Sequence, residues 1–585
     1  MGLVAKRTGA MHVSTIVARR GNKEYVSHLV RRSFREDGKV KHETLANLSS
    51  LPDAAVEVVR GALAGKTMFT ADESVEVTRS LPHGHVAAIG AQAKALGLPG
   101  LLGPAGRKRD LAFALVVARV ARPGSKLATT RWWADTTLAT DLGVAEATTD
   151  EVYAAMDWLA GRQDAIEKQL AARHLNETVN PHRLALFDLS SSWMTGSHCP
   201  LAARGYSRDG KKGLPQIEYG LLTDPVGRPV AVKVFPGNTA DPTAFTSICE
   251  AMRKKLDLGE MVMVGDRGMI TSARIEALRE LGGYGWVTAL RAPQIAALAA
   301  DDGPLQMSLF DQADLAEIAH PDYPGERLIA CRNPALAAER ARKRAALLDA
   351  TDTNLAAIAA AAGKGRLTGK DKIGIRVGKV IGKHKMEKHY TLTIADTSLT
   401  FTRNTTSIGA EAALDGIYLI RTTVPAATMT PAQVVTTYKS LANVERDFRS
   451  IKSIDLDLRP IHHRTETRVR AHVFICTLAA YLVWHLRKAW KPLTFTDEHR
   501  PTPTDPVAPA KRSPAAQVKA ATKTTTDGLP ARSFTSLLDH LATLTRNTID
   551  IADSNQPGFD LLAIPTPQQR QAFELLGAPI PLHLK

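Results

Sequence analysis

The stretch from residue 183 to residue 290 constrains the fold most, because five short apolar or β-branched runs follow one another within it. The runs are Leu184–Asp188, Gln216–Leu222, Val230–Phe235, Met261–Gly265 and Trp286–Leu290. Helical patterns at Pro242–Leu256 and Thr271–Leu281 lie on either side of the fourth run. Runs of this length that precede and then alternate with helices indicate strands of an α/β fold.

Two of these runs stop at an aspartate, in Leu-Ala-Leu-Phe-Asp188 and Met-Val-Met-Val-Gly-Asp266. We expect each aspartate at the C-terminal end of its strand, where a rigid sheet holds the carboxylate and ligands can reach it. Taken singly, each aspartate is better explained as a turn residue or a helix cap than as part of a functional site. A functional interpretation therefore needs both aspartates and a further acid.

A third acid, Glu445, lies in the segment Tyr438–Lys452, for which the pattern predicts a helix over 431–452. At about 100° per residue, a stripe roughly 80° wide contains Tyr438, Leu441, Glu445, Arg449 and Lys452. The alternative for Glu445 is an exposed pair with Arg449, four residues on. If the three acids converge, they could hold two divalent cations, and the basic side chains of the stripe could hold nucleic-acid phosphates.

The charge of the chain favours a polyanionic partner. It has 75 Lys and Arg against 59 Asp and Glu, a net charge of +16 and a pI of about 9.6. Such an excess is most often found in proteins that bind DNA or RNA, although a ribosome-associated or simply basic protein remains an alternative. The 585 residues predict three or four domains, and 44% apolar residues allow sizeable cores.

The four cysteines, Cys199, Cys249, Cys331 and Cys476, include no close pair, which suits a reducing cytosol. No signal-peptide pattern follows Met1, and the longest apolar stretch, Val473–Trp484, is too short to span a bilayer. We therefore expect a cytoplasmic protein, associated with the nucleoid when bound to DNA and without a membrane partner.

Pattern and composition divide the chain into seven predicted parts. Residues 11–48 alternate apolar and polar residues around the turn signals Gly21-Asn22 and Asp37-Gly38, which predicts a small β-meander as the first part, 1–50. A helical, DNA-end-binding domain is predicted at 51–180. The α/β core follows in two parts, at 181–290 and at 418–490 (with a second helix at 466–487), and an insertion at 291–417 separates them. A proline-rich flexible linker at 491–532 and a C-terminal helical module at 533–585 complete the prediction. Within the insertion we expect a helical arm, Ala335–Ala362, and basic strands, Lys364–Tyr390.

Together these residues resemble the DDE transposases of bacterial insertion sequences, in the cut-and-paste group with the signature helix Tyr-x2-Arg-x3-Glu-x6-Lys. Tyr438, Glu445 and Lys452 match that spacing, and Leu441 stands where the arginine usually is. The resemblance spans about 183–487 and also rests on Phe-Asp188-Leu-Ser-Ser, Gly205-Tyr-Ser-Arg-Asp209, Gly227-Arg-Pro-Val, Gly237-Asn-Thr-Ala-Asp241, Val264-Gly-Asp266-Arg-Gly268 and Leu458-Arg-Pro-Ile461.

The resemblance implies a ribonuclease H-like catalytic core interrupted by a mainly β insertion, behind the β-meander and the helical domain. It implies that Asp188, Asp266 and Glu445 are catalytic and hold two Mg²⁺ (or Mn²⁺) ions, a role that suits carboxylate oxygens. It also implies DNA-binding roles for Tyr438, Arg446, Arg449, Lys452 and Arg267, with Arg446 and Arg449 making up for the missing arginine at 441.

The function implied is a DNA transposase that binds the inverted-repeat ends of its element, cleaves them and joins the 3′-ends to target DNA. A homodimer is expected in the synaptic complex, because two ends must be held together. Two alternatives stay open: a ribonuclease H-like nuclease without strand transfer, and a domesticated, non-catalytic DNA-binding protein. The presence of all three acids and of Lys452 weighs against the second.

Overall fold

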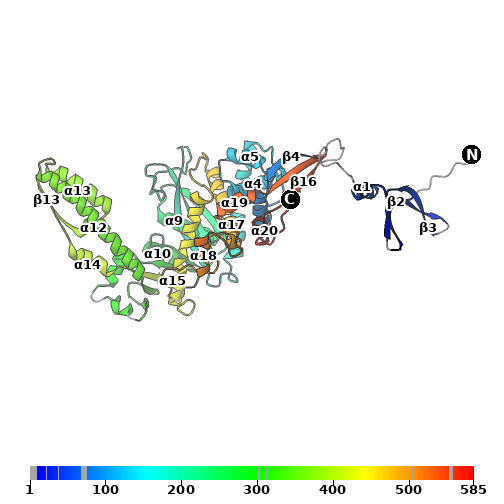
Figure 1. Ribbon diagram of the computed structural model, residues 1–585. Coiled ribbons are helices and arrows are strands. Elements are labelled where there is room, and N and C mark those ends of the chain that lie inside the picture. The colour runs from blue at the N-terminus through cyan, green and yellow to red at the C-terminus, as the bar shows by residue number, and fades with distance from the viewer. Residues whose placement is uncertain are drawn as a thin grey trace, which may run out of the picture. The chain divides into compact units, whose positions relative to one another are not determined.

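The computed structural model describes residues 9–21, 23–36, 39–66, 75–196, 198–300, 303–310, 312–502, 505–551 and 558–584. The chain forms two compact units (Figure 1). The first comprises residues 1–80 with 546–563, and the second comprises 81–545 with 564–585. The predicted turn residues Asn22, Asp37 and Gly38 lie outside the described residues.

In the first unit, three strands form an antiparallel sheet in chain order: β1 (Met11–Arg20), β2 (Lys23–Glu36) and β3 (Lys39–Asn47). The predicted meander is confirmed. Helix α1 (Asp53–Leu63) packs on β1, and its Arg60 Nη1 donates to the Val13 carbonyl at 3.2 Å. A second sheet has the order β16-β15-β4 and contains β4 (Val75–Pro82), β15 (Thr545–Ile551) and β16 (Phe559–Leu562). The C-terminal module, predicted to be helical, therefore also contains strands, because residues 545–551 alternate β-branched and polar side chains.

The second unit begins with the predicted helical block. Its helices are α2 (Gly84–Ala95), α3 (Leu98–Leu102), α4 (Arg107–Ala121), α5 (Lys126–Ala134), α6 (Thr137–Leu142), α7 (Thr149–Ala160) and α8 (Gln163–His174). Helices α5 and α6 follow each other closely but are separate elements. The Thr136 side chain accepts a hydrogen bond from the backbone N–H of Leu138 and so starts a new helix there.

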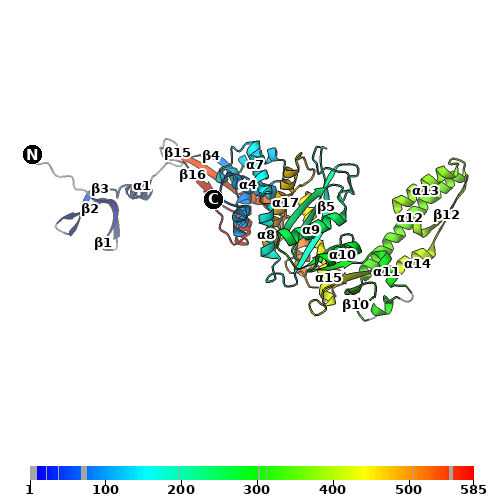
Figure 2. The same cartoon turned by 180° about the vertical axis from the view of Figure 1, so that it is seen from behind.

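An eight-stranded sheet forms the centre of the second unit, with the order β10-β11-β14-β9-β8-β5-β6-β7. Its strands are β5 (Leu184–Trp193), β6 (Gln216–Thr223), β7 (Pro229–Pro236), β8 (Met261–Val264), β9 (Tyr284–Ala289), β10 (Leu315–Ile318), β11 (Arg327–Arg332) and β14 (Ile417–Thr422). β5, β6 and β7 form an antiparallel meander, and β8 and β9 run parallel to β5. All five predicted strands and both predicted helices, α9 (Asp241–Lys255) and α10 (Ser272–Leu281), are confirmed. Figure 2 labels β5, α9 and α10. This mixed α/β order is consistent with a ribonuclease H-like fold.

Helix α17 (Glu466–Ala489) is the core helix of this unit and packs against α4, α7 and β7. Among the described residues it is the one helix long and apolar enough to cross a bilayer. Of its most apolar 18-residue window, 83% is buried inside the protein. Its apolar composition is therefore explained by packing in the core.

The helix predicted over 431–452 is wrong as one continuous element. The structure has α15 (Pro431–Lys439), α16 (Leu441–Arg449) and a π-helical turn, η3 (Ser450–Ile454). Ser440 lies between the two helices, and its hydroxyl donates to the Thr437 carbonyl at 2.6 Å, a local bond that competes with helix continuation.

Residues 334–413, which we call the arm, differ most from the prediction. They contain α12 (Pro334–Gly363), α13 (Lys370–His384), the short turn η2 (Glu387–His389), β12 (Tyr390–Ile394), β13 (Leu399–Arg403) and α14 (Thr405–Ala413), seen together in Figure 1. The helical segment 335–362 is confirmed as α12. The basic strands predicted over 364–390 are wrong, because most of that stretch is α13. Its buried Ile373, Val377 and Ile381 recur every four residues, a helical spacing that β-branched composition obscured.

The rest of the insertion consists of α11 (Ala292–Leu298), the short turn η1 (Met307–Phe310) and strands β10 and β11, which extend the central sheet through β14. The predicted flexible linker contains η4 (Lys491–Leu493) and α18 (Pro514–Thr522), and α19 (Phe534–Ala542) and α20 (Pro567–Glu574) follow it. Buried Lys519 of α18 donates to the Thr494 carbonyl at 3.1 Å and to Glu498 Oε1 at 2.6 Å. These contacts hold α18 in place, so the described part of 491–532 is ordered structure.

Candidate active site

Asp188 and Asp266 lie on neighbouring parallel strands at the same level. The last β5–β8 pair in register is Leu186 with Val264, and each aspartate stands two residues beyond it. Asp188 is not at the end of its strand as predicted, because β5 continues to Trp193 and Asp188 pairs with Leu221 of β6. Residues two apart on a strand face the same side, so the register directs both carboxylates to one place.

The loop after β8 orients the Asp266 side chain. Asp266 Oδ1 accepts hydrogen bonds from the backbone N–H groups of Gly268 at 2.9 Å and Met269 at 2.6 Å. Asp266 is exposed, and two bonds to one oxygen leave Oδ2 for a ligand. The predicted turn role and the predicted ligand role are therefore compatible.

Helix α16 brings in Glu445. Its Val444 and Phe448 are buried, and the Phe448 ring packs edge-on against Tyr219 of β6 with 5.6 Å between ring centroids. Because α16 also packs against β5, its exposed side presents Glu445 near the two aspartates.

Asp188 is half-buried, and its electrostatic environment includes the other two acids. Burial first, and then the negative charges of Asp266 and Glu445, raise the pKa of Asp188 to about 7. Like charges this close disfavour ionisation of one another, and a bound cation relieves that repulsion. Three carboxylates supply oxygen ligands, which Mg²⁺ and Mn²⁺ prefer, so the donor set fits such ions in chemistry. Among the described residues, however, no three His, Cys, Asp or Glu side chains already form a closed metal-binding group.

Tyr438, at the end of α15, lies within the same electrostatic environment. Burial and the charges of Asp266 and Glu445 raise the pKa of the Tyr438 phenol to about 12, against a smaller opposite effect of Arg267. The phenol therefore keeps its proton at neutral pH and can donate a hydrogen bond.

Three of the predicted DNA-binding cations surround the acids and are exposed: Arg267, Arg446 and Arg449. Within the described part of the chain, none of their guanidinium groups lies in an ion pair, and each can reach an external anion.

Lys452 differs from the other predicted cations because it is buried, and its Nζ donates to Asp209 Oδ1 at 2.7 Å. The Asp209 side chain is 1% exposed, and it also pairs with Arg459. Burial lowers the pKa of the Lys452 ammonium, and Asp209 opposes that effect. That Lys452 shares one helical stripe with Glu445 stays a prediction, and the two side chains differ in burial, because Glu445 is exposed and Lys452 lies in the π-helical turn η3 and is buried.

Two residues of the loop after β5 have roles that the sequence did not indicate. Asp209 is the partner of Lys452, and the positive charge of Arg208 lowers the pKa of Asp188 against the stronger effect of burial. Both belong to the quoted motif Gly205-Tyr-Ser-Arg-Asp209, but nothing in one sequence connects that motif to residue 452. Arg208 and Glu218 also form an ion pair at 3.3 Å beside a cavity of about 300 Å³ that Tyr206 and Asn238 help to line.

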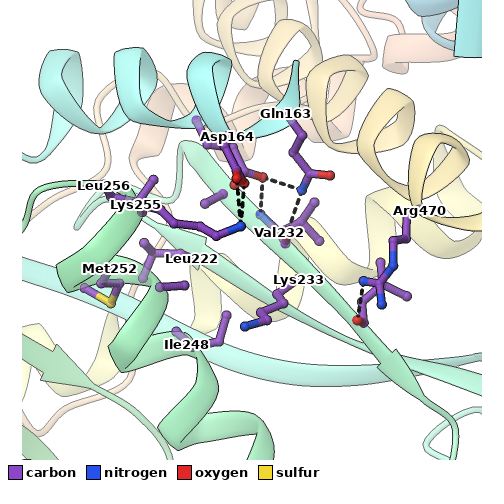
Figure 3. Close-up of a pocket in the computed structure, with 14 residues that line it drawn as sticks. Gln163, Asp164, Leu222, Val232, Lys233, Ile248, Met252, Lys255, Leu256 and Arg470 are labelled. Carbon is purple, nitrogen blue, oxygen red and sulfur yellow. Dashed lines mark hydrogen bonds and ion pairs between the residues drawn. The ribbon is translucent and has the colours of Figure 1, made fainter. Parts of the chain in front are cut away.

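A second cavity, of about 290 Å³, lies between α8, β7, α9 and α17 (Figure 3). It contains none of the predicted site residues. Its charged groups contact one another or the backbone: Lys255 Nζ lies 2.7 Å from Asp164 Oδ2, and Arg470 donates to the Val234 carbonyl at 2.7 Å. This cavity is therefore a joint between the helical block and the sheet, and the acid cluster is the candidate active site.

Comparison with known families agrees with this assignment of the fold and the site region. Residues 182–482, just over half of the chain, match the family described as "Transposase DDE domain". Residues 14–75 match the family described as "IS1634 family transposase, N-terminal domain". No curated protein matches the chain.

Proposed function

The chain belongs to the transposase DDE-domain family and is a DNA transposase of an insertion sequence, and from this premise we propose its reaction in detail. The protein binds the inverted-repeat ends of its own element, cleaves the DNA there with divalent metal ions, and joins the freed 3′-ends to target DNA. The observation that carries the proposal is the register of β5 and β8, which places Asp188 and Asp266 at the same level, together with the packing of α16, which carries Glu445, against β5.

The three acids are the proposed catalytic residues, and Asp188, Asp266 and Glu445 would hold two Mg²⁺ (or Mn²⁺) ions. When bound, such a pair of ions activates the attacking water or 3′-hydroxyl and stabilises the leaving oxygen of an in-line phosphoryl displacement. The chain supplies rigid positioning: Asp188 is fixed within a buried strand, Asp266 by its turn and Glu445 by the packing of α16. Positioning and charge stabilisation are the main protein contributions in phosphoryl transfer.

The DNA backbone is bound by the cations around the acids. Arg267, Arg446 and Arg449 are exposed and would pair with phosphates, and Tyr438 would donate a hydrogen bond. Lys452 would position the end of the signature segment through Asp209; a direct contact of Lys452 with DNA stays a prediction that requires release of that pair. Since two element ends have to be joined in one reaction, we also propose a homodimer in the synaptic complex.

The test uses the full chain, Mg²⁺ and a linear duplex that carries the inverted repeat found beside the reading frame. Cleavage at the repeat followed by joining of the 3′-end to a second, unlabelled duplex supports the proposal. Cleavage without joining favours a nuclease, and repeat-specific binding without cleavage favours a DNA-binding protein without activity. A duplex of the same length and composition with the repeat scrambled is the control.

A further inference from the structure

One face of α13 carries a row of cations that the active site does not use. Lys372, Arg376, Lys379 and Lys383 are all exposed. They are spaced i, i+4, i+7 and i+11, which places them within a stripe about 60° wide and about 16 Å long on an α-helix. We call these four side chains the α13 ridge.

The packing of the arm fixes the direction of the ridge. Ile373, Val377 and Ile381 of α13 are buried in a separate hydrophobic core, together with Leu348, Leu355 and Ile358 of α12 and Tyr390 and Leu399 of the β12–β13 hairpin. At 100° per residue, the ridge is centred about 130° around the helix from the buried residues of α13. Ile375 is the large apolar side chain of α13 that stays exposed, and one such residue is not the continuous apolar face that membrane-surface helices insert into lipid.

The acids of the arm leave the ridge charge uncompensated. The arm has fourteen Lys and Arg against seven Asp and Glu. Four of the acids pair with cations outside the ridge: Glu339 with Arg342 and Lys343, Asp349 and Asp352 with Arg403, and Glu411 with Lys388. Within the described residues, no ridge side chain forms an ion pair, so four cations stand in a row without a protein counter-charge.

The side of α13 next to the ridge is uncovered as well. A Cβ added at Gly374, Gly378 or Gly382 would meet no atom within 4 Å. The protein itself therefore does not occupy the space in front of this helix, and a large partner can approach it.

We propose that the α13 ridge binds the phosphate backbone of duplex DNA without regard to sequence, at a surface separate from the catalytic acids. The inference rests on the proposed function for the identity of the polyanion. Duplex DNA carries a negative charge about every 3.4 Å along each strand, so a row about 16 Å long faces several phosphates at once. Contacts from Lys and Arg side chains to phosphates position DNA and carry no sequence information directly.

The test compares two double variants of the full chain in their affinity for a random-sequence duplex. Lys372→Gln with Lys379→Gln removes two ridge charges. Arg342→Gln with Lys343→Gln removes two charges from exposed residues of the same arm that already pair with Glu339. The ridge variant should bind roughly tenfold more weakly at about 0.1 M salt and should lose about 1.8 from the slope of log K against log salt. The control variant should retain both values.

Unchanged affinity and slope in the ridge variant, with intact helical circular dichroism, would overturn the proposal. The same result in a second variant, Arg376→Gln with Lys383→Gln, would exclude compensation by the remaining pair. Weaker binding of a poly-glutamate chain together with unchanged binding of duplex DNA would also reject it, in favour of an acidic protein partner.

The outcome can be separated from that of the proposed function. If the unaltered chain fails to cleave repeat DNA and the ridge variant still loses salt slope, the catalytic proposal is wrong and the ridge stands. If the unaltered chain cleaves repeat DNA and the ridge variant keeps the salt slope, the catalytic proposal stands and the ridge proposal is wrong. The affinity of the ridge variant is also measured for a repeat duplex with and without flanking sequence. If the variant loses affinity only when the flanking sequence is present, the ridge contacts DNA beside the repeat. If it loses affinity only for separate random-sequence duplexes, the ridge contacts target DNA.

Discussion

Lys452 Nζ lies 2.7 Å from Oδ1 of Asp209 in the interior of the catalytic unit. The pair connects the π-helical turn after α16 to the loop after β5, two segments 243 residues apart. Arg459 reaches the same carboxylate. The lysine that completes the signature spacing therefore holds the helix of Glu445 against the strand of Asp188, and we assign it a positioning role.

Replacing Lys452 by alanine should lower stability more than DNA affinity. Loss of one partner from a buried ion pair leaves the other charge without full compensation and lowers the free energy of unfolding by about 3 kcal/mol. Because Arg459 still pairs with Asp209, we expect a somewhat smaller decrease here. We expect a lower midpoint in urea unfolding, reduced cleavage, and an unchanged salt slope for binding to random duplex. A slope lower by about one would instead show that Lys452 contacts a phosphate directly.

Arg449→Ala is the matched control for that experiment. Arg449 lies three residues before Lys452 and is exposed, so its removal should leave the unfolding midpoint within about 0.5 kcal/mol of the unaltered protein. The same change should weaken DNA binding and reduce the salt slope by about one. Opposite patterns in the two variants distinguish a positioning residue from a phosphate-binding residue.

Each of the three acids should be required for chemistry and dispensable for binding. Asp188→Asn, Asp266→Asn and Glu445→Gln each remove a charge with little change in volume. We expect each to reduce cleavage of repeat DNA by at least about a hundredfold. Binding to the same DNA without metal should be equal or tighter, because one repulsive charge near the phosphates is gone. Near-normal cleavage by any of the three would remove that residue from the site; Asp257→Asn, an exposed change elsewhere in the unit, is the control.

The strands and the positions of the two aspartates on or next to them were predictable from the sequence because the signals are local, whereas the catalytic role of the three acids stays a prediction. Each strand between 184 and 290 is a short apolar run, and the two aspartates are fixed by position within those runs. The exact ends were not predictable: β5 continues past Asp188 because its next residues pair with β6 far along the chain.

The errors arose where a tertiary contact or a local side-chain bond decides the structure. Ser440 interrupts the signature helix through its own hydroxyl, and α13 was mistaken for strands because β-branched residues conceal a helical period. The burial of Lys452 depends on Asp209, and no feature of one sequence relates the two positions. Pair contacts of this kind become visible only in three dimensions.

Divalent ions should stabilise the chain before any DNA is present. Because Asp266 and Glu445 raise the pKa of Asp188, a cation at the three acids relieves repulsion in the folded state only. We expect Mg²⁺ or Mn²⁺ at a concentration about 100 times its Kd to stabilise the unaltered protein by about 2.7 kcal/mol. The stabilisation is measured as a rise in the thermal midpoint of unfolding when Mg²⁺ or Mn²⁺ is added. The double variant Asp188→Asn with Asp266→Asn should show no such rise, and EDTA should reverse the rise in the unaltered chain. Equal shifts in both proteins would mean that the ions bind elsewhere.

Glu167 of α8 should make stability depend on pH far from the acid cluster. Its Oε1 accepts from the backbone N–H of Val232 at 3.0 Å and from Gln163 Nε2 at 2.8 Å, and it lies at the cavity of Figure 3. Burial raises the pKa of Glu167 to about 8 from a usual value of 4.5. Between these two pH values the folded chain holds a proton that the unfolded chain has released. The stability from the neutral side chain is therefore complete below about pH 4.5 and is lost as the pH rises through about 8.

Glu167→Gln tests this directly, because glutamine keeps the accepting oxygen and cannot ionise. The variant should resemble the unaltered protein below about pH 5 and exceed it in stability above about pH 8, by on the order of 5 kcal/mol at most. Urea unfolding at a series of pH values gives the difference. Glu250→Gln, an exposed residue of α9, should show no such divergence. Parallel stability curves for the Glu167 variant and the unaltered chain would mean that Glu167 is ionised in the folded protein, with its charge compensated within the cavity.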